Sequence, residues 1–179
     1  MSSRRLVVAH TATLDEEDLA QARALLYRCF ADMSEADWQH ALGGTHVFAY
    51  EGEKLVGHGA LIPRRLLYGG RALRAGYIEA VAVDPEQRRK GHGGAMMDEL
   101  ERIIAANYEL GALGATDEGA LFYAARGWRA WQGTTWANDP DGRRVRTAQE
   151  DGCIFVREAG TKLDLSVELT CDWREGDAW

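Results

Sequence analysis

Residues 81–97, VAVDPEQRRKGHGGAMM, constrain the fold more than any other stretch of the sequence. A run of β-branched and small residues ends at Pro85, a basic loop with three glycines follows, and an apolar helical pattern then continues to about Tyr108. This order predicts a strand, a glycine-rich loop and a helix in direct succession. The first N–H groups of such a helix lack intrahelical partners, so the loop is a candidate anion site, with a pyrophosphate as its natural ligand.

Two familiar phosphate-binding patterns are absent from this loop. The P-loop pattern G-x-x-x-x-G-K-[ST] does not occur, because Lys90 precedes the glycines, and the dinucleotide pattern G-x-G-x-x-G does not occur either. Taken alone, the loop is equally compatible with a basic turn whose glycines serve only its geometry. For an anion it offers close backbone approach and positive charge, from Gly91, Gly93 and Gly94 and from Arg88, Arg89 and Lys90.

The rest of the sequence alternates predicted strands and helices. A helix is expected from the capping box of Thr13 and Glu16 to about residue 30, and a shorter one after Ser34. We predict an α/β (α+β) fold in one domain over residues 1–179, with a mixed central sheet and helices on both faces. The other predicted elements are strands at 5–11, 45–51, 54–68, 71–83, 110–113, 127–138, 153–156 and 163–169, and a helix at 117–126.

Composition and charge exclude several classes of protein. The net charge of −7 argues against nucleic acid as a partner and suits a cationic one, although an acidic balance also serves solubility alone. No segment approaches the roughly 20 apolar residues of a membrane span, and no signal-length apolar run follows the start. The three cysteines and five histidines have neither disulfide-framework nor metal-ligand spacing, so we expect a cytoplasmic protein without a metal.

Two motifs resemble one known superfamily. RRKGHG (88–93) is similar to the Arg/Gln-x-x-Gly-x-Gly/Ala signature of the GCN5-related N-acetyltransferases (GNAT), and LFYAARGW (121–128) is similar to their FYxxxGW segment. The resemblance implies the GNAT fold and acetyl-CoA as co-substrate. It also implies that main-chain groups of Val81 and Val83 pair with the pantetheine arm, and that the amides of Arg88, Arg89, Lys90, Gly91, His92, Gly93 and Gly94 hold the pyrophosphate.

The superfamily reaction is direct attack of an amine on the thioester in a ternary complex, which needs a base and an acid. Glu79, two residues before Val81, is the candidate base. Since an ordinary glutamate has a pKa of about 4.3, it would act through water or with a raised pKa. Tyr123 is the candidate acid. The alternatives are a solvated strand glutamate and an aromatic core residue, and Cys171 is expected to be an inert thiol.

Longer segments, among them IPRRLLYGGRALRAGYIEAVAV (62–83) and ELTCDWREGDAW (168–179), resemble the actinobacterial aminoglycoside 2′-N-acetyltransferases over nearly the whole chain. This resemblance implies a homodimer that acetylates the 2′-amino group of aminoglycosides. Two positions depart from the family pattern, Gly114 for serine and Glu150 for aspartate, and they bear on the aminoglycoside range. The implied substrate contacts are Asp32, Glu79, the main chain near Ala80, Gly114, Glu150, Asp177 and the terminal carboxylate of Trp179.

Two other functions stay open. One is an acetyltransferase of this fold whose amine is a cell-wall amino sugar or a small thiol metabolite, and the other is a non-catalytic acetyl-CoA-binding module. The presence of both Glu79 and Tyr123 argues against the module. The last residues are expected to be anchored by Trp173 and Trp179 so that Asp177 faces the ammonium groups of the substrate. The alternative is an acidic tail held only by hydrophobic packing.

Overall fold

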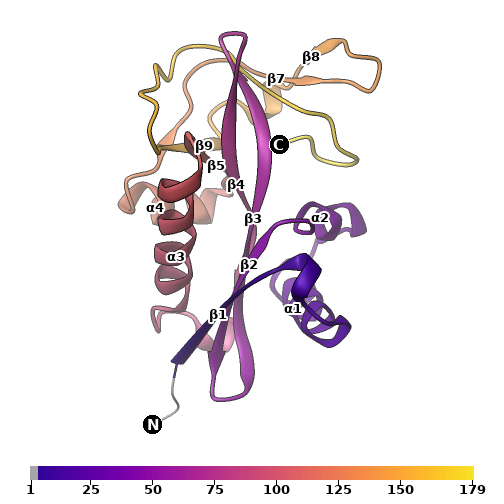
Figure 1. Ribbon diagram of the computed structural model, residues 1–179, viewed down its shortest axis with the longest axis vertical. Helices are drawn as coiled ribbons and strands as arrows, with labels where there is room; N and C mark the ends of the chain where they lie inside the picture. The colour runs from indigo at the N-terminus through magenta and orange to yellow at the C-terminus, as the bar shows by residue number, and fades with distance from the viewer. Residues whose placement is uncertain (1–3) are drawn as a thin grey trace. The chain divides into compact units, whose positions relative to one another are not determined.

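The computed structural model describes residues 4–179 (Figure 1). Two compact units can be distinguished: the described residues up to Ile62 together with Ile78–Arg102, and Pro63–Tyr77 together with Ile103–Trp179. Strand β3 (Lys54–Tyr68), strand β4 (Arg71–Val83) and helix α3 (His92–Asn107) continue from the first unit into the second. The single domain expected over residues 1–179 stays a prediction.

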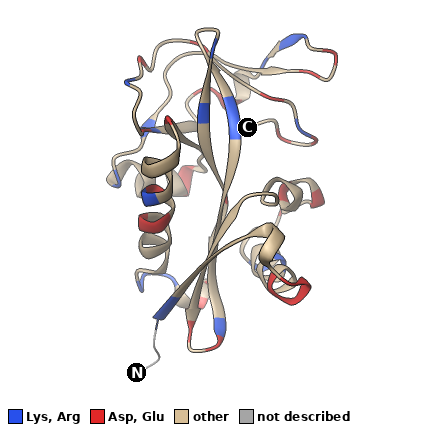
Figure 2. Ribbon diagram, in the orientation of Figure 1, with Lys and Arg blue, Asp and Glu red and all other residues tan. Residues whose placement is uncertain are grey.

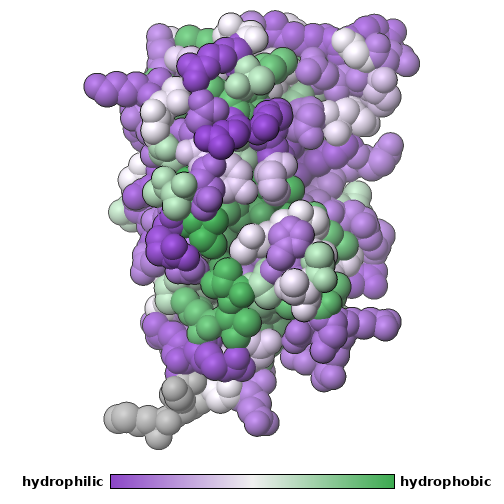
Figure 3. All heavy atoms as spheres, in the orientation of Figure 1, coloured by the Kyte–Doolittle hydropathy of each residue, from purple (hydrophilic) through white to green (hydrophobic). Residues whose placement is uncertain are grey.

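The sheet of the first unit is built from neighbouring strands of the chain. Strand β1 (Arg4–His10) pairs antiparallel with β2 (Thr45–Glu51), and β2 pairs antiparallel with β3. The predicted hairpin between β2 and β3 is confirmed, and its turn contains Gly52 in the left-handed region, with φ 61°. Figure 3 shows apolar residues gathered on the surface over β1 and β2, where Val8 is exposed.

Helices cover both faces of this sheet. On one face, α1 (Glu16–Cys29) and α2 (Glu35–His40) form one apolar cluster with strand residues (Figure 1). On the other face, a Cβ atom added at Gly57 would lie 3.0 Å from Met96, and one added at Gly59 would lie 3.1 Å from Leu100. The two glycines therefore let α3 pack closely on β3. The apolar cluster beneath α1 and α2 includes Ala22, Leu25, Leu26, Trp38, Phe48 and Ala60.

The start of α1 differs from the prediction. Asp15 caps the helix and accepts a hydrogen bond from the Asp18 N–H at 2.9 Å, whereas Thr13 lies in the 3₁₀ turn η1 (Thr11–Thr13). The Thr13 hydroxyl donates to the His10 carbonyl at 2.9 Å and is therefore occupied before the helix begins. The cap of α2 at Ser34 is confirmed.

The second unit has parallel and antiparallel pairs in strand order β6-β9-β5-β4-β3-β10-β7-β8. Strand β4 is parallel to β5 and β10 is parallel to β7, whereas β9 is antiparallel to both β5 and β6. The predicted mixed sheet is confirmed. The remaining elements of this unit are β5 (Leu110–Gly114), α4 (Asp117–Ala125), β6 (Arg129–Ala130), β7 (Thr135–Asn138), β8 (Arg144–Arg146), β9 (Ile154–Glu158) and β10 (Leu169–Cys171).

Two predicted strands of this unit are wrong in extent. The segment 127–138 forms two short strands, because Gly133 passes so close to another loop that a Cβ atom there would lie 2.1 Å from the Val167 carbonyl oxygen. The N–H groups of Gln132 and Gly133 donate to the Leu165 carbonyl, which uses these groups outside any strand ladder. Of the segment 163–169, only Leu169 is in a strand, and β8 was not predicted.

The last residues of the chain are held firmly within the second unit. Trp179 is 4% exposed, and its indole N–H donates to the Thr147 hydroxyl at 2.9 Å. The buried Arg64 guanidinium of β3 donates to the carbonyl oxygens of Asp172 and Ala178 at 3.0 and 2.7 Å, and to the Asp172 carboxylate at 2.8 Å. Trp173, in contrast, is 41% exposed. Anchoring by Trp179 is confirmed, and the same expectation for Trp173 is wrong.

This difference between two tryptophans of one segment predicts different stabilities for matched variants. Trp179→Ala should lower the free energy of unfolding by roughly 3–5 kcal/mol, because it leaves a cavity in the core. Trp173→Ala should change the free energy of unfolding by only about 0.5 kcal/mol, because Trp173 is exposed and belongs to no buried core cluster. Urea denaturation followed by circular dichroism measures both values, and equal losses would contradict the described burial.

Candidate functional site

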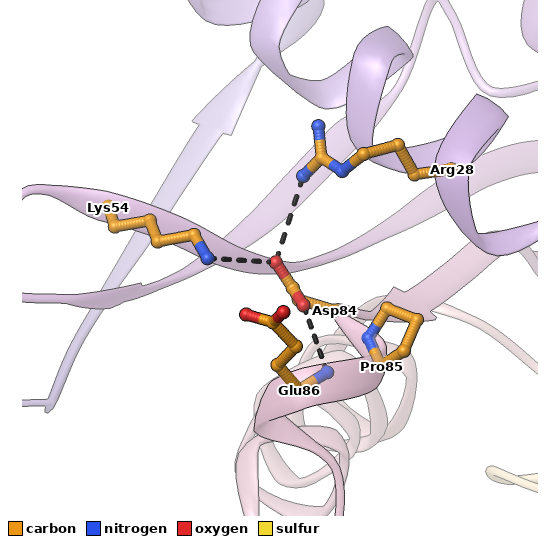
Figure 4. Close-up of a pocket in the computed structure, with 5 residues that line it drawn as sticks. All are labelled: Arg28, Lys54, Asp84, Pro85 and Glu86. Atoms are coloured by element: carbon orange, nitrogen blue, oxygen red, sulfur yellow. Dashed lines mark hydrogen bonds and ion pairs between the residues drawn. The ribbon is translucent and has the colours of Figure 1, made fainter.

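The loop between β4 and α3 is anchored by a buried carboxylate, Asp84 (Figure 4). Its side chain accepts from the Glu86 N–H at 3.0 Å and lies 3.1 Å from the Lys54 ammonium and 3.8 Å from the Arg28 guanidinium. Burial alone would raise the pKa of Asp84. The hydrogen bond and the two cations lower it by more, so the pKa lies below the ordinary value for aspartate. The Asp84 N–H also donates to the Val56 carbonyl at 2.8 Å, which fixes the end of β4 to β3.

The loop itself has the backbone geometry of an anion site. Arg89 and Gly91 both lie in the left-handed region, with φ 62° and 82°, and a non-glycine residue is uncommon there. Left-handed residues in a tight loop turn successive N–H groups toward one side, as in anion-binding nests. The Ala95 N–H donates to the Gly91 carbonyl at 3.1 Å, which begins the hydrogen bonding of α3. The N–H groups just before Ala95, in the first turn of the helix, therefore have no intrahelical partner.

Basic side chains surround this loop in the first unit. Arg88, Arg89 and Lys90 are exposed. Arg4 of β1 adds a fourth cation that the sequence did not indicate, since its guanidinium donates to the Lys90 carbonyl. Figure 2 shows this basic character at the start of β1 and in the loop before α3. Main chain and charge together fit a pyrophosphate.

His92 is oriented differently from its neighbours in the loop. Its ring is 1% exposed and lies 3.3 Å from the Glu51 carboxylate. Burial is the largest cause that lowers the pKa of His92, so the imidazole is neutral near pH 7. The side chain faces the interior of the unit, which leaves the main-chain N–H of His92 for an anion.

The candidate base lies beside an irregular position of β4. Glu79, Ala80 and Val81 are half-buried, and Ala80 has a φ of 53° within the strand. The Ala80 carbonyl accepts a hydrogen bond from His58 Nδ1 at 3.0 Å. Asp32 lies in the exposed turn between α1 and α2 of the same unit. The left-handed residue rotates the local peptide groups away from regular strand geometry, so they are not arranged as in a ladder.

The second unit brings acidic residues together around Cys153. Burial, and then the charge of Asp177, raises the pKa of Glu150 in the 3₁₀ turn η3 (Ala148–Glu150). Burial also raises the pKa of the Cys153 thiol, with further contributions from Glu150, Asp117, Asp151 and Asp177. Asp151 is neutralised by the Arg146 guanidinium. We call Asp117, Glu150 and Asp177 the acidic cluster.

Asp177 is oriented by the anchored tail. Its carboxylate accepts from the Trp179 N–H at 3.0 Å, so the burial of the Trp179 indole limits where this charge can lie. The main-chain oxygen of Trp179 accepts from Arg174 at 2.5 Å and is therefore already paired with a cation of the same unit. Burial raises the pKa of Cys171 to about 11, and its thiol donates to the Ala178 carbonyl at 3.2 Å, as expected of an inert cysteine.

The candidate acid, Tyr123, lies on α4 and contacts Trp128, the last residue of the same motif. The Tyr123 ring is half-buried and packs edge-on against Trp128, with ring centroids 6.3 Å apart. The Tyr123 carbonyl accepts from the Trp128 N–H at 3.1 Å, which explains the spacing of the two aromatic residues. Burial raises the pKa of Tyr123 to about 12, so the phenol keeps its proton at neutral pH.

Gly114, at the exposed end of β5, has room for a side chain. A Cβ atom there would lie 3.7 Å from the Tyr77 hydroxyl, an ordinary van der Waals distance. The glycine therefore leaves space that a serine would occupy, without any backbone requirement for glycine.

The residues predicted from the sequence divide between the two units. The first holds Asp32, Glu79, Ala80, Val81, Val83 and the loop 88–94, and the second holds Gly114, Tyr123, Glu150, Asp177 and Trp179. Sequence reasoning missed Asp84, Asp117 and Arg64. Only Asp84 had a local signal, as the residue before Pro85.

The described part of the chain has neither a metal site nor a membrane-spanning helix. No group of three or more His, Cys, Asp and Glu side chains among residues 4–179 is arranged to hold a metal ion. In the same range, no helix is long and apolar enough to cross a membrane.

Comparison with known proteins places this geometry in a family. A model described as an acetyltransferase (GNAT) domain matches residues 10–130. The chain is 45% identical over 184 residues to an aminoglycoside 2′-N-acetyltransferase of Mycolicibacterium fortuitum, a match that covers 100% of this chain and 93% of that protein.

Solved structures share the fold at low sequence identity. A GNAT family acetyltransferase from Brucella melitensis, in complex with acetyl-CoA, is 16% identical with a TM-score of 0.59, over 92% of this chain and 94% of that one. A probable N-acyltransferase from Enterococcus faecalis is 20% identical with a TM-score of 0.62, over 75% of this chain and only 33% of that one. The family model and the full-length relative show that the chain belongs to the GNAT acetyltransferases.

Proposed function

We propose that the protein is an aminoglycoside 2′-N-acetyltransferase that uses acetyl-CoA. The observation that carries the proposal is the 45% identity, along the whole chain, to an enzyme of that name. The homodimer implied by the family resemblance belongs to the same proposal.

The loop before α3 is proposed to bind the cofactor. Acetyl-CoA supplies an acetyl group activated as a thioester. The amides of Arg88 through Gly94 hold its pyrophosphate, and the main chain of Val81 and Val83 extends along the pantetheine arm. The left-handed Arg89 and Gly91 support this role, because they orient the loop amides before any ligand arrives.

The acidic cluster is proposed to bind the ammonium groups of the aminoglycoside. Burial raises the pKa of Glu150, and the negative charge of Asp177 raises it further. A bound ammonium group would lower that pKa again, so binding and ionisation of Glu150 favour each other. Asp117 extends the cluster beyond the residues expected from the family. Asp32, the main chain at Ala80, and Trp179 complete the proposed contacts.

Acetyl transfer from an ammonium group requires that two protons leave the nitrogen, one before and one after attack, and that the departing thiolate receive one. Glu79 is proposed to accept the first proton through a water molecule, which gives the neutral amine. The amine nitrogen then forms a bond to the acetyl carbon as the C–S bond breaks, and its second proton is lost to solvent. The Tyr123 phenol donates its proton to the thiolate and regains one from solvent. Its raised pKa supports this role, because the proton is available at every physiological pH.

A second candidate is an acetyltransferase of this family that acts on another amino sugar. The open space at Gly114 favours it, since a family contact to the sugar is missing there. Glu150 is one methylene longer than the usual aspartate and changes the same part of the proposed site.

The choice of amine can be tested with matched antibiotics. Free CoA should appear when tobramycin is added with acetyl-CoA, but much more slowly with kanamycin A or amikacin, because these two lack a 2′-amino group. A thiol reagent follows the release continuously. Equal rates with both sets, or none with either, would contradict the proposed function, and faster acetylation of another amino sugar would favour the second candidate.

The role of Tyr123 predicts a specific defect. Tyr123→Phe should lower kcat by about 100-fold or more, because general acids contribute that much. The kcat of the unaltered enzyme should not decline on the alkaline side up to about pH 10, since Tyr123 would still be protonated. Tyr108→Phe, which removes another half-buried phenol of the second unit, is the control and should keep full activity.

The anchor at Asp84 predicts a defect in cofactor binding. Asp84→Ala should weaken acetyl-CoA binding about tenfold, because loss of roughly 1.5 kcal/mol of charged hydrogen bonding leaves the loop less ordered. Glu86→Ala should bind normally, since only the main-chain N–H of Glu86 contacts Asp84. Isothermal titration calorimetry compares the two, and an unchanged Kd for Asp84→Ala would refute the anchoring role.

A further inference from the structure

Two buried histidines of the first unit have no place in the proposed chemistry. His46 on β2 and His58 on β3 are both 0% exposed, and His46 Nδ1 lies 2.9 Å from His58 Nε2. Polar rings in a core usually need every hydrogen bond satisfied. The other two ring nitrogens are also bonded, one to Thr11 and the other to Ala80.

The partner at one end determines the direction of every bond. His58 Nδ1 lies 3.0 Å from the Ala80 carbonyl oxygen, which only accepts, so Nδ1 carries a proton. In a neutral ring His58 Nε2 is then an acceptor, and His46 Nδ1 must donate to it. His46 Nε2 is in turn an acceptor for the Thr11 hydroxyl at 2.7 Å.

The other end is consistent with this direction. The Thr11 hydroxyl accepts from the Gly43 N–H at 2.9 Å and has a single hydrogen to donate. Two acceptors lie near that hydrogen, His46 Nε2 at 2.7 Å and the Gly44 carbonyl at 3.2 Å. The shorter contact completes an unbroken series of donors from Gly43 to Ala80, which we call the histidine relay.

The relay requires both rings to be neutral. A second proton on His58 would place two donors face to face between the rings. Burial, with a smaller repulsion from a neighbouring histidine in each case, lowers the pKa of His46 to about 4 and that of His58 to about 3. Both rings therefore remain neutral at physiological pH, as the hydrogen-bond directions demand.

The relay ends on the one residue of β4 that departs from strand geometry. Ala80 has a φ of 53°, a conformation that alanine rarely adopts without support from its surroundings. Hydrogen bonds arranged in series polarise one another, so the last bond, to the Ala80 carbonyl, is strengthened by those before it. Glu79 and Val81 are attached directly to this residue.

We propose that His46 and His58 are positioning residues for acetyl transfer. Their relay holds the Ala80 peptide in the left-handed conformation and so fixes the orientation of the Glu79 side chain and the Val81 N–H. Neither ring touches substrate or cofactor in this role. The inference rests on the proposed function, in which Glu79 accepts the proton of the amine.

The test compares two nearly isosteric variants. His58→Asn keeps an N–H donor at the Nδ1 position, whereas His58→Leu removes it. The backbone φ of Ala80, measured by NMR from its H–N–Cα–H coupling and ¹³C shifts, should stay positive in His58→Asn and become negative in His58→Leu. A positive φ in both variants would overturn the proposal.

Kinetics then separate positioning from packing. His58→Leu should lose about 10- to 100-fold in kcat and should raise the KM for acetyl-CoA, because neither Glu79 nor the Val81 N–H is then held in place. His58→Asn should recover most of both. Equal rates in the two variants would overturn the positioning role. If the unaltered enzyme acetylates no aminoglycoside, the proposed function fails, and the φ of Ala80 still decides whether the relay holds that peptide.

A measurement on the unaltered protein covers the case in which His58→Leu does not fold. Long-range ¹H–¹⁵N spectra of histidine-labelled protein should show both rings as the neutral Nδ1–H tautomer from pH 8 to about 5.5. A Nε2–H tautomer at either ring, or protonation in that range, would break the series of donors and refute the relay.

Discussion

The N–H groups at the start of α3 have no carbonyl partner within the helix, and much of the first unit is organised around them. Asp84 fixes the strand end that precedes them, and Arg89 and Gly91 turn the intervening loop. Gly57 and Gly59 let the helix approach the sheet closely. The proposed anion site is thus made mainly of backbone, which buried contacts hold in place, while the basic side chains remain exposed to solvent.

Local patterns in the sequence predicted the elements and the loop well. The capping residue Ser34, the hairpin at Gly52 and the strand–loop–helix join all depend on residues a few positions apart, and all are present. The errors at 127–138 and 163–169 arose where two loops pack together. There, hydrogen bonds such as that from Gly133 to Leu165 replace a ladder, and no alternation of apolar residues reveals them.

The candidate site follows the same division. The loop residues and Tyr123 could be predicted as site residues because their motifs are contiguous, and Glu150 and Asp177 only through the family resemblance. His46, His58 and Arg64 were missed, because their partners lie on other strands or far along the chain and nothing in the flanking sequence marks them. The same lack of long-range information led to the wrong expectation for Trp173, whose exposure depends on neighbours from elsewhere.

The hydrogen bonds from Arg64 to the C-terminal segment affect how the sequence of that segment can change in evolution. Arg64 donates to the main-chain carbonyl oxygens of Asp172 and Ala178. Because every residue has a carbonyl oxygen, these two hydrogen bonds do not depend on the side chains at these positions. The indole of Trp179 supplies the second attachment. Residues 173–177 therefore lie between two attached points, with Arg174 and Asp177 bonded to the main chain of Trp179 and Trp173 exposed. Such a segment can acquire new charges and new preferences for a cationic ligand without any rebuilding of the sheet beneath it.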